Sequence, residues 1–305
     1  MTPGAPQGIL VVDKPSGPTS HDVVARLRRI FGTRQVGHCG TLDPLATGVL
    51  VTCLGRYTRL SPWLTGQDKE YHADLQLGSV STTGDAQGEL TPVAGAKPCA
   101  AEDVSRVLAT FLGHIEQVPP AHSAVRIDGE RAYRRARRHE EVVLPARRVC
   151  IRELQLECFA YPRLVLRVVC SKGTYVRSLA TDIGARLGCG AYVAQLRRLR
   201  AGALDLQDAH TLEALQVDCA PGAAAPFVPV LRALSGLAHV ALPAEQAERF
   251  THGGPVAVAS TAPADGPVDC AVFRGDGAFC GIGRWDVERG QLSPVRVVCA
   301  VGAEA

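Results

Sequence analysis

The sequence predicts an α+β fold with a mixed, mostly antiparallel central sheet. Strand-like and helix-like periodicities follow one another without a regular strand–helix–strand repeat, which disfavours a purely parallel sheet. The clearest strand signal is Tyr71–Leu77, in which apolar and polar residues alternate. From about Leu237 onward, short strand-like runs separated by glycines predict a small β-rich domain that ends the sequence.

The length supports the same division, because 305 residues are enough to bury a large core and to form two domains. The stretch Asp218–Pro226 is rich in Ala, Gly and Pro and has the composition of a linker. We therefore expect a first domain over residues 1–235 and a second domain over residues 236–305.

The first elements can be placed from local pattern. The short apolar run Gly8–Val12 predicts a strand. Ser20 is the expected N-cap of a following helix, because residues 23, 24, 27 and 30 form an apolar stripe at helical spacing. The apolar run Val49–Leu54 predicts a buried strand.

Later elements follow the same logic. Glu102–Leu112 has helical spacing, the apolar content of Leu164–Cys170 predicts a strand, and Leu179–Leu187 predicts a helix that Gly188 ends. The strands expected in the second domain are His239–Leu242, Val268–Phe273, Ala278–Trp285 and Val295–Val301.

The composition excludes several classes. Hydrophobic residues make up 46% and charged residues 21% of the chain, as in ordinary globular proteins. The 11 cysteines form no C-x-x-C pair, so we expect buried thiols and no zinc site. No secretory signal precedes the first strand, and no apolar run is long enough for a bilayer. We expect a cytoplasmic protein that does not associate with membranes.

Basic residues are concentrated in one segment. Between Ala121 and Arg152 there are nine arginines and four acidic residues, a local surplus of +5 in a chain whose total is +3. Such a segment is typical of a surface that binds a polyanion. A solvated helical face with a few ion pairs explains the charge equally well.

A polar, glycine-rich run, Gly37–Gly48, carries Asp43 just before the apolar strand. A carboxylate held on such a loop can act as a nucleophile, a general base or a counter-ion. An isolated Asp-Pro pair more often only caps a turn. The twelve residues in order, however, resemble the signature loop of pseudouridine synthases of the bacterial tRNA U55 (TruB) type.

Four further segments are similar to motifs of the same family and occur in the same order. They are Gly8–Pro15, Lys69–Tyr71, Ser171–Arg177 and Leu196–Leu199. The last domain resembles a PUA domain, with Gly253–Val256 as its best local match. The resemblance implies the pseudouridine synthase fold followed by a PUA-like RNA-binding domain.

The resemblance also implies a reaction and its residues. Uridine 55 in the T loop of tRNA would be flipped out and isomerised to pseudouridine, with Asp43 at the ribose C1′ and Tyr71 and Arg177 as the other catalytic residues. The basic segment at about residues 115–150 would be the insertion that grips RNA. The expected substrate-binding residues are His38, Tyr175, Leu196, Lys14, Arg59, Arg198, Arg134 and Arg137.

No cofactor, metal ion or obligatory protein partner is expected, because the isomerisation moves no electrons and imports no group. The sequence also lacks a Walker A pattern, a G-x-G-x-x-G run and a metal-ligand cluster. The expected partner is tRNA, through its T stem-loop.

Several alternatives stay open. Tyr71, Tyr175 and Leu196 could be ordinary core residues, His38 a structural hydrogen-bonding residue and Arg177 a surface arginine. The competing class is a non-catalytic RNA-binding or RNA-folding protein on the same scaffold, and an RNA-guided relative that modifies ribosomal RNA is a closer rival. Two segments depart from the family pattern, namely His122 and Ser81–Asp85, and we expect neither departure to touch the catalytic residues.

Overall fold

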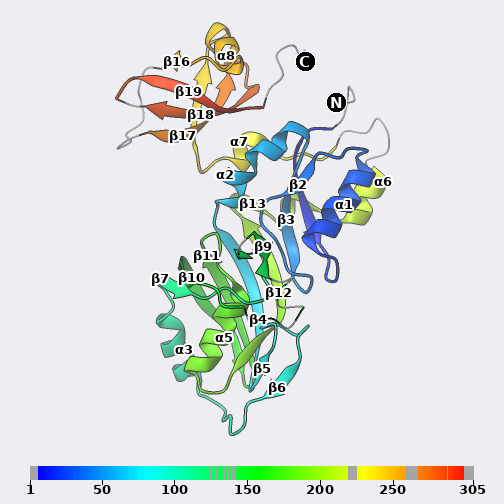
Figure 1. The fold of residues 1–305 in the computed structure, drawn as a ribbon, viewed down its shortest axis with the longest axis vertical. Helices are drawn as coiled ribbons and strands as arrows, with labels where there is room; N and C mark the ends of the chain where they lie inside the picture. The colour runs from blue at the N-terminus through cyan, green and yellow to red at the C-terminus, as the bar shows by residue number, and fades with distance from the viewer. Residues whose placement is uncertain are drawn as a thin grey trace.

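The computed structural model describes residues 6–123, 125–127, 129–132, 135, 138, 140, 142–218, 225–258, 267–286 and 288–298. In these ranges a ten-stranded sheet has the main strand order β14-β1-β3-β12-β4-β11-β10-β7, with β2 added to β3 and β13 to β12. Its neighbours are parallel only at β1–β14 and β3–β12 and antiparallel elsewhere. The prediction of a mixed, mostly antiparallel sheet is therefore confirmed (Figure 1).

The strands of this sheet are β1 (Gly8–Lys14), β2 (Val36–His38), β3 (Thr47–Leu54), β4 (Lys69–Leu77), β7 (Gly113–Gln117), β10 (Arg147–Ala160), β11 (Arg163–Cys170), β12 (Ala191–Ala201), β13 (Leu204–Asp205) and β14 (Ala209–His210). The helices around it are α1 (Ser20–Ile30), η1 (Gly55–Leu60), α2 (Ser61–Thr65), α3 (Ala101–Ala109), α5 (Val176–Arg186), η2 (Leu206–Asp208), α6 (Leu212–Asp218) and α7 (Val230–Ala233). Two small hairpins accompany them, β5 (Ser79–Ser81) with β6 (Leu90–Pro92) and β8 (Arg126–Ile127) with β9 (Glu130–Arg131).

The two faces of the sheet are covered differently along its width. In β1, Leu10 and Val12 pack in the cluster that includes α1 and α5, whereas Ile9 and Val11 pack on the other side. In β4 only one face is apolar, as the alternation of Tyr71–Leu77 predicts. Its opposite face is polar and forms ion pairs with β11 and β12, for example Arg163 with Asp74.

A second, five-stranded sheet closes the described chain and has the order β15-β17-β18-β19-β16. Its elements are β15 (Ala238–Leu242), α8 (Ala244–Thr251), β16 (Val256–Ala257), β17 (Val268–Arg274), β18 (Phe279–Asp286) and β19 (Gln291–Val297). The separate β-rich sheet that the sequence predicts is confirmed, and it lies at one end of the molecule's long axis (Figure 1). It contacts η1 and α2, where the Trp63 indole donates to Asp269 at 3.0 Å.

Two details of the sequence prediction are wrong. Thr19, not Ser20, is the N-cap of α1, because the Thr19 hydroxyl accepts from the Asp22 amide and Asp22 accepts from the Thr19 amide. Strand β19 begins at Gln291 instead of Val295, because Gln291 and the residues after it already pair with β18. The sequence pattern misses this start because Pro294 interrupts the apolar alternation.

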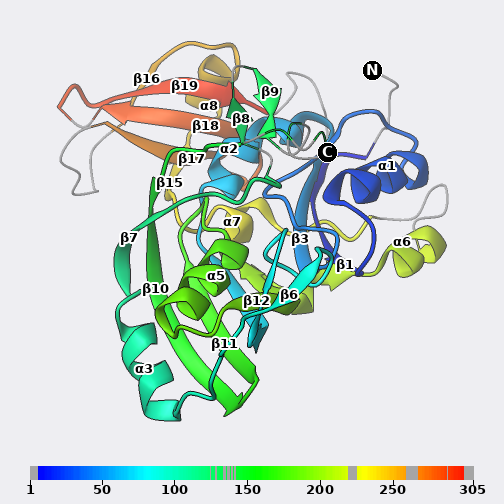
Figure 2. The same ribbon diagram turned by 60° about the horizontal axis from the view of Figure 1, so that its bottom comes forward.

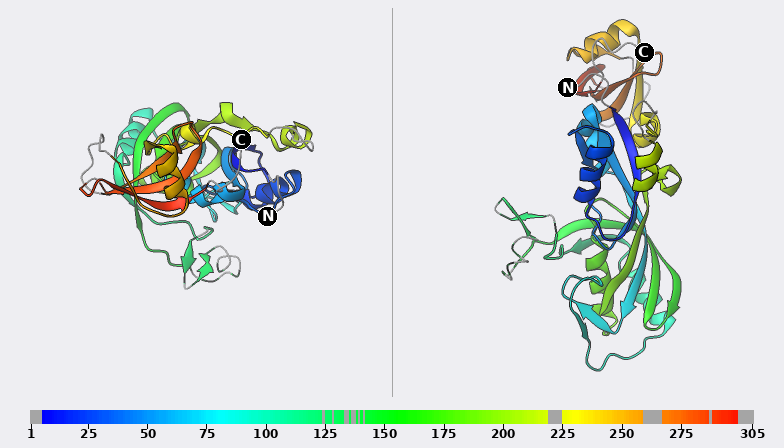
Figure 3. Two further views of the ribbon diagram at one scale, coloured as in Figure 1. Left: turned by 90° about the horizontal axis from the view of Figure 1, so that it is seen from above. Right: turned by 90° about the vertical axis from the view of Figure 1, so that its right-hand side faces the viewer.

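The predicted basic insertion leaves the sheet between two neighbouring strands. Gln117 at the end of β7 pairs with Arg147 at the start of β10, so residues 118–146 form an excursion from the sheet edge. Within it the hairpin of β8 and β9 projects away from the sheet (Figure 3). The predicted RNA-binding residues Arg134 and Arg137 lie outside the described residues.

The helices are distributed along the sheet. Helices α1 and α6 lie together beside β1, whereas α5 packs on the central strands β12 and β4, and α3 lies beside β10 and α5 (Figure 2). None of the helices in the described part of the chain is both long enough and apolar enough to span a bilayer.

Candidate active site

A cavity of about 1100 Å³ opens where several segments distant in the sequence meet. Its walls come from the loop between β2 and β3, from β4, from the turn before α5, from β12 and from the excursion between β7 and β10. Seven of the predicted site residues line it, namely His38, Asp43, Tyr71, Tyr175, Arg177, Leu196 and Arg198. The structure therefore brings together the three residues that the family resemblance assigned to catalysis.

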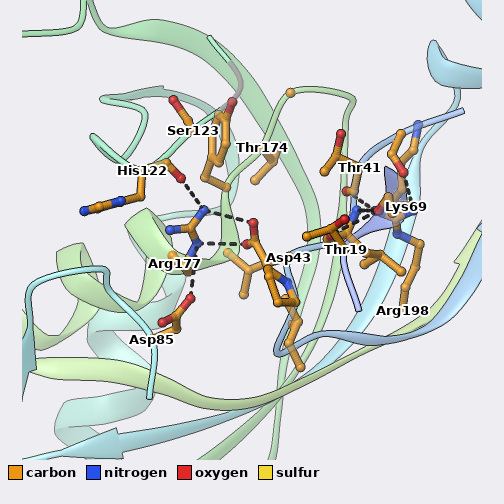
Figure 4. Close-up of a pocket in the computed structure, with 18 of the residues that line it drawn as sticks. Thr19, Thr41, Asp43, Lys69, Asp85, His122, Ser123, Thr174, Arg177 and Arg198 are labelled. Carbon is orange, nitrogen blue, oxygen red and sulfur yellow. Dashed lines mark hydrogen bonds and ion pairs between the residues drawn. The ribbon is translucent and has the colours of Figure 1, made fainter. Parts of the chain in front are cut away.

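Asp43 and Arg177 form a bidentate ion pair in this cavity (Figure 4). The Arg177 Nε donates to Asp43 Oδ2 at 2.9 Å, and its Nη2 donates to Oδ1 at 3.0 Å. The Arg177 side chain is only 5% exposed, whereas that of Asp43 is 34% exposed. The fork of the guanidinium thus fixes the carboxylate plane and leaves the carboxylate accessible from the cavity.

Arg177 is itself held from the other side. Its Nη1 donates to the Thr83 carbonyl and its Nη2 to the His122 carbonyl, both at 2.9 Å. The buried Asp85 carboxylate lies 3.8 Å from Arg177 Nε, so the guanidinium lies between two carboxylates (Figure 4). These partners make the orientation of Arg177 independent of any bound molecule.

Asp85 is a site residue that the sequence prediction missed. It lies in Ser81–Asp85, one of the two segments that depart from the family pattern. The Thr83 hydroxyl donates to its Oδ1 at 2.6 Å, and the Gln87 amide donates to the same atom at 3.1 Å. The prediction that neither departure touches the catalytic residues is wrong, because Thr83, Asp85 and His122 all contact Arg177.

The loop of Asp43 is built on polar contacts to β1 and α1. The Ser20 hydroxyl accepts from the Leu42 amide at 2.8 Å and donates to the Leu42 carbonyl at 3.0 Å. On the other side of Asp43, the Gly17 amide donates to the Pro44 carbonyl at 2.8 Å. The residues before and after Asp43 are thus anchored to the start of the chain.

Lys14 has a different role from the predicted one. Its side chain is 0% exposed, and its Nζ donates to the carbonyls of Pro15, Pro44 and Ala46 at 2.8, 3.2 and 2.7 Å. Burial lowers the pKa of the Lys14 ammonium to about 8. Because no part of Lys14 reaches the surface, the expected contact with RNA is wrong, and Lys14 supports the Asp43 loop instead.

Tyr71 forms part of the cavity floor from β4. Its side chain belongs to the core cluster and also lines the cavity, so the core and site interpretations hold together. Its hydroxyl accepts from Arg198 Nε at 3.3 Å, and the Arg198 guanidinium lies 5.4 Å from the ring centroid. Burial raises the pKa of the Tyr71 phenol above its usual value, and the nearby Arg198 charge offsets part of this.

Three further predicted residues complete the walls. His38 lies at the end of β2, Leu196 lies in β12, and Tyr175 precedes α5. The Tyr175 backbone is fixed by Gln117, whose side chain accepts from the Tyr175 amide at 2.8 Å and donates to its carbonyl at 3.1 Å. Burial raises the pKa of the Tyr175 phenol.

Arg59 is not part of the cavity. It lies in η1, and its Nη1 donates to the Val297 carbonyl at 2.9 Å, so it joins η1 to the last strand of the five-stranded sheet. Arg198 lines the cavity but is buried, with contacts to backbone and to Tyr71. The expected contacts of both residues with RNA stay predictions, because Arg59 is exposed and Arg198 lines the cavity.

Nothing in the described ranges gathers three or more His, Cys, Asp or Glu side chains where they could hold a metal ion. The cavity lining includes the Asp43 carboxylate oriented by Arg177 and the Tyr71 phenol beside Arg198.

Comparison with known families covers most of the chain. The model described as TruB family pseudouridylate synthase (N terminal domain) matches residues 28–176. The tRNA pseudouridylate synthase B C-terminal domain matches residues 177–247, and the pseudouridine synthase II TruB, C-terminal model matches residues 238–298.

Individual relatives agree. The chain is 46% identical over 287 residues to the tRNA pseudouridine synthase B of Leifsonia xyli, which covers 88% of this chain and 93% of the relative. It is 40% identical over 299 residues to the tRNA pseudouridine synthase B of Ralstonia nicotianae, which covers 95% of this chain and 94% of the relative.

Solved structures show the same architecture. A chain in an archaeal box H/ACA sRNP Nop10–Cbf5 complex superposes with a TM-score of 0.74 at 25% identity, over 96% of this chain and 86% of that chain. A chain of a Cbf5–Nop10–Gar1 complex gives a TM-score of 0.77 at 26% identity, over 96% and 85% of the two chains. Together with the identity to full-length relatives, these matches establish that the chain belongs to the TruB family of pseudouridylate synthases.

Proposed function

We propose that this protein isomerises uridine 55 in the T loop of tRNA to pseudouridine, with Asp43 acting at the ribose C1′. The observation that carries the proposal is the bidentate Asp43–Arg177 pair, which presents an accessible, oriented carboxylate in a cavity with Tyr71. The relatives named tRNA pseudouridine synthase B support tRNA as the substrate.

The first step is cleavage of the bond between C1′ and N1. Positive charge develops at the anomeric carbon, and a carboxylate meets such charge in glycoside chemistry as well. Arg177 holds both oxygens of Asp43, so the carboxylate need not reorient as the charge develops. The detached uracil then turns within the cavity until C5 faces C1′.

The second step forms the new C1′–C5 bond and must release the proton of C5. The Tyr71 phenol gives its own proton to solvent and then, as the phenolate, accepts the proton of C5. N1 takes up one proton, so the product is an isomer of the substrate and no cofactor is consumed. Tyr71 is suited to this relay because its hydroxyl is oriented by Arg198 and its ring forms part of the cavity floor.

The uridine must leave the stacked loop to reach Asp43. Extruding a base costs about a few kcal/mol, and a side chain that stacks in its place offsets part of this cost. His38 fills the space that the base leaves, and the cavity of about 1100 Å³ is large enough for a nucleotide. Single-stranded loops are the RNA elements whose bases can be turned out most readily, which favours a tRNA loop as the substrate.

The division of labour follows the sheet arrangement. We assign catalysis to residues 1–235, with the excursion at about residues 115–150 gripping the RNA backbone, and PUA-like RNA binding to residues 236–305. The expected substrate places the enzyme in the cytoplasm with its tRNA. An RNA-guided role is less well supported, because the relatives named tRNA pseudouridine synthase B are 40–47% identical and the Cbf5-containing complexes about 25%.

Primer extension after carbodiimide treatment of an unmodified tRNA transcript tests the proposal. Wild-type protein is expected to give a stop at position 55, and Asp43→Asn none. Asp13→Asn is the matched control, because Asp13 also forms a two-point pair with an arginine, Arg197, but lies outside the cavity. Equal stops from wild type and Asp43→Asn would contradict the role of Asp43, and a stop at another position would contradict the assignment of uridine 55 as the target.

A further inference from the structure

Arg198 is among the most completely buried large side chains of the described chain, and it lies beside the candidate active site. It is 2% exposed and extends from β12 to three other segments. Its Nη1 donates to the carbonyls of Gly40 and Val49 at 3.1 and 3.3 Å, and its Nη2 donates to that of Thr41 at 2.8 Å. Its Nε donates to the Tyr71 hydroxyl at 3.3 Å.

The charge of Arg198 is unusual for so buried a position. Over the described residues, no carboxylate lies within ion-pair distance of it, and all its hydrogen-bond acceptors are neutral. The neighbouring Arg197 points the other way and forms a two-point pair with Asp13. Burying a charge without a counter-charge is costly, so a neutral side chain would stabilise this position at least as well.

The four acceptors explain what the guanidinium can do there. Gly40 and Thr41 belong to the loop that carries Asp43, Val49 begins the apolar part of β3, and Tyr71 belongs to β4. A guanidinium is planar and its donors have fixed directions, unlike the rotating donors of a lysine. One rigid group therefore sets the position of the Tyr71 oxygen relative to the loop two residues before Asp43.

We infer that Arg198 is a positioning residue for the isomerisation, which fixes the Tyr71 hydroxyl relative to the Asp43 loop and meets negative charge on the Tyr71 oxygen. This inference rests on the function proposed above, which gives Asp43 and Tyr71 their roles at the uridine. It replaces the predicted contact of Arg198 with RNA by a role beneath the cavity floor.

The electrostatic surroundings of Tyr71 favour this role. The groups that act on the phenol are Arg198 from β12, Cys170 from β11 and Asp43 from the loop. Burial, the Cys170 thiol and the Asp43 carboxylate raise the pKa of Tyr71, and Arg198 alone among these groups lowers it. When the Tyr71 oxygen relays the proton of C5, the Arg198 charge is the one placed to stabilise the oxygen.

The test compares Arg198→Gln, Arg198→Lys and the matched control Arg197→Gln in single-turnover reactions at saturating tRNA. Arg198→Gln is expected to lower the rate by about 100-fold, because misplacing a reacting group by about 1 Å has that effect. Arg198→Lys keeps the charge and can hold the loop carbonyls, so it folds but loses the donor to Tyr71 and still reacts slowly. Arg197→Gln is expected to react within about threefold of wild type, as for a change remote from the chemistry.

Two readouts separate positioning from general damage. With deuterium at C5 of the target uridine, the isotope effect on the rate is expected to rise in both Arg198 variants, because C5–H cleavage becomes slower. In a Tyr71→Phe background, Arg198→Gln is expected to cost much less than it costs alone, since the two residues act as a unit. Melting curves report whether each variant is folded. If Arg198→Gln does not fold, the rate and the isotope effect of Arg198→Lys decide the test.

Wild-type rates in the Arg198 variants would overturn the inference. So would a loss of rate with an unchanged isotope effect and with the full loss repeated in the Tyr71→Phe background. The proposed function fails separately, if Asp43→Asn and Tyr71→Phe themselves react like wild type. Loss of activity in those two variants together with normal Arg198 variants would leave the function standing and remove only the positioning role.

Discussion

Asp43 and Arg177, which lie 134 positions apart in the chain, are joined by two hydrogen bonds of 2.9 and 3.0 Å in a single planar pair. The pair joins the loop before β3 to the start of α5, which follows β11, and β3 and β11 are not neighbours in the sheet. No local pattern in the sequence predicts this contact. Only the family resemblance assigns the two residues to one site, and the hydrogen bonds of Arg177 to the Thr83 and His122 carbonyls make the pair rigid.

Replacing Arg177 by Lys is expected to lower the single-turnover rate by about 100-fold or more, because a lysine offers a point charge in place of a two-point fork. The contacts of Arg177 to the Thr83 and His122 carbonyls are lost as well. Affinity for tRNA is expected to stay within about threefold, since Arg177 is too buried to contact much RNA. Filter binding and quenched-flow kinetics measure the two effects.

Arg163→Lys is the control for that change. Arg163 also contacts a carboxylate through two nitrogens, with Asp74 Oδ2 at 2.8 and 2.7 Å, but on the polar face of β4. Arg163→Lys is expected to leave the rate unchanged, because neither Arg163 nor Asp74 lines the cavity. An equal loss of rate in both variants would show that the Arg177 effect is not specific to the site.

Sequence periodicity recovers the strands whose faces are consistently apolar or polar. Strand β4 is the clearest case, because Ala73, Leu75 and Leu77 are buried on one face of a regular pleat. The same reasoning fails for Lys14, since its burial depends on carbonyls of Pro44 and Ala46 far along the chain. Local pattern cannot predict a partner that only the tertiary fold brings near.

The site shows the same limit. The family motifs identify Asp43, Tyr71 and Arg177, and the structure places all three around one cavity. They do not identify Asp85, because its contact to Arg177 depends on a turn after β5 that the sequence does not mark as functional. The sequence also does not show which charges of the excursion are paired, because the ion pairs of Arg138 with Glu130 and Glu140 depend on how the excursion folds.

The basic excursion yields a prediction about salt. Arg134→Ala with Arg137→Ala is expected to weaken tRNA binding and to reduce the slope of log Kd against log salt by about 1 per lost phosphate contact. Arg138→Ala is expected to do less, because Arg138 already pairs with Glu130 at 2.8 Å and with Glu140 at 2.5 Å. Binding measured over a series of KCl concentrations, with chemistry measured at saturating tRNA, tests both. A larger effect from Arg138 than from the other two would contradict the assignment.

Lys69 predicts a pH dependence of stability. It lines the cavity, donates to the Thr65 and Gln67 carbonyls at 2.6 Å, and has its pKa lowered from 10.5 to about 8 by burial. Between these two pKa values the unfolded chain holds a proton that the folded chain has released, so raising the pH favours folding. Below about pH 8 both states are protonated, and the cost of the buried charge is fully present.

The measurement for Lys69 is the free energy of unfolding of wild type minus that of Lys69→Met, from about pH 7 to about pH 9.5. This difference is expected to be flat below about pH 8 and to rise above it by at most about 1.4 kcal/mol per pH unit. Groups that are common to both proteins and do not interact with Lys69, such as Lys14, cancel in the difference. A difference that stays constant over the whole range would show that Lys69 titrates normally.

Gly48 gives a prediction about the backbone beneath the site. Its φ is +96°, and a Cβ added there would lie 2.1 Å from the Arg198 carbonyl oxygen, where β3 and β12 pair in parallel. Gly17 has a similar φ of +106°, but a Cβ added to Gly17 would meet no atom within 4 Å. Both alanine variants bear the cost of a positive φ, so comparing Gly48→Ala with Gly17→Ala isolates the steric clash. Because the clashing atom is backbone, the strands must separate, and we expect Gly48→Ala to be less stable than Gly17→Ala by at least about 2 kcal/mol in urea denaturation. The same shift moves Arg198, so Gly48→Ala is also expected to react more slowly with tRNA when folded, and equal stability of the two variants would contradict the close approach of β3 to Arg198.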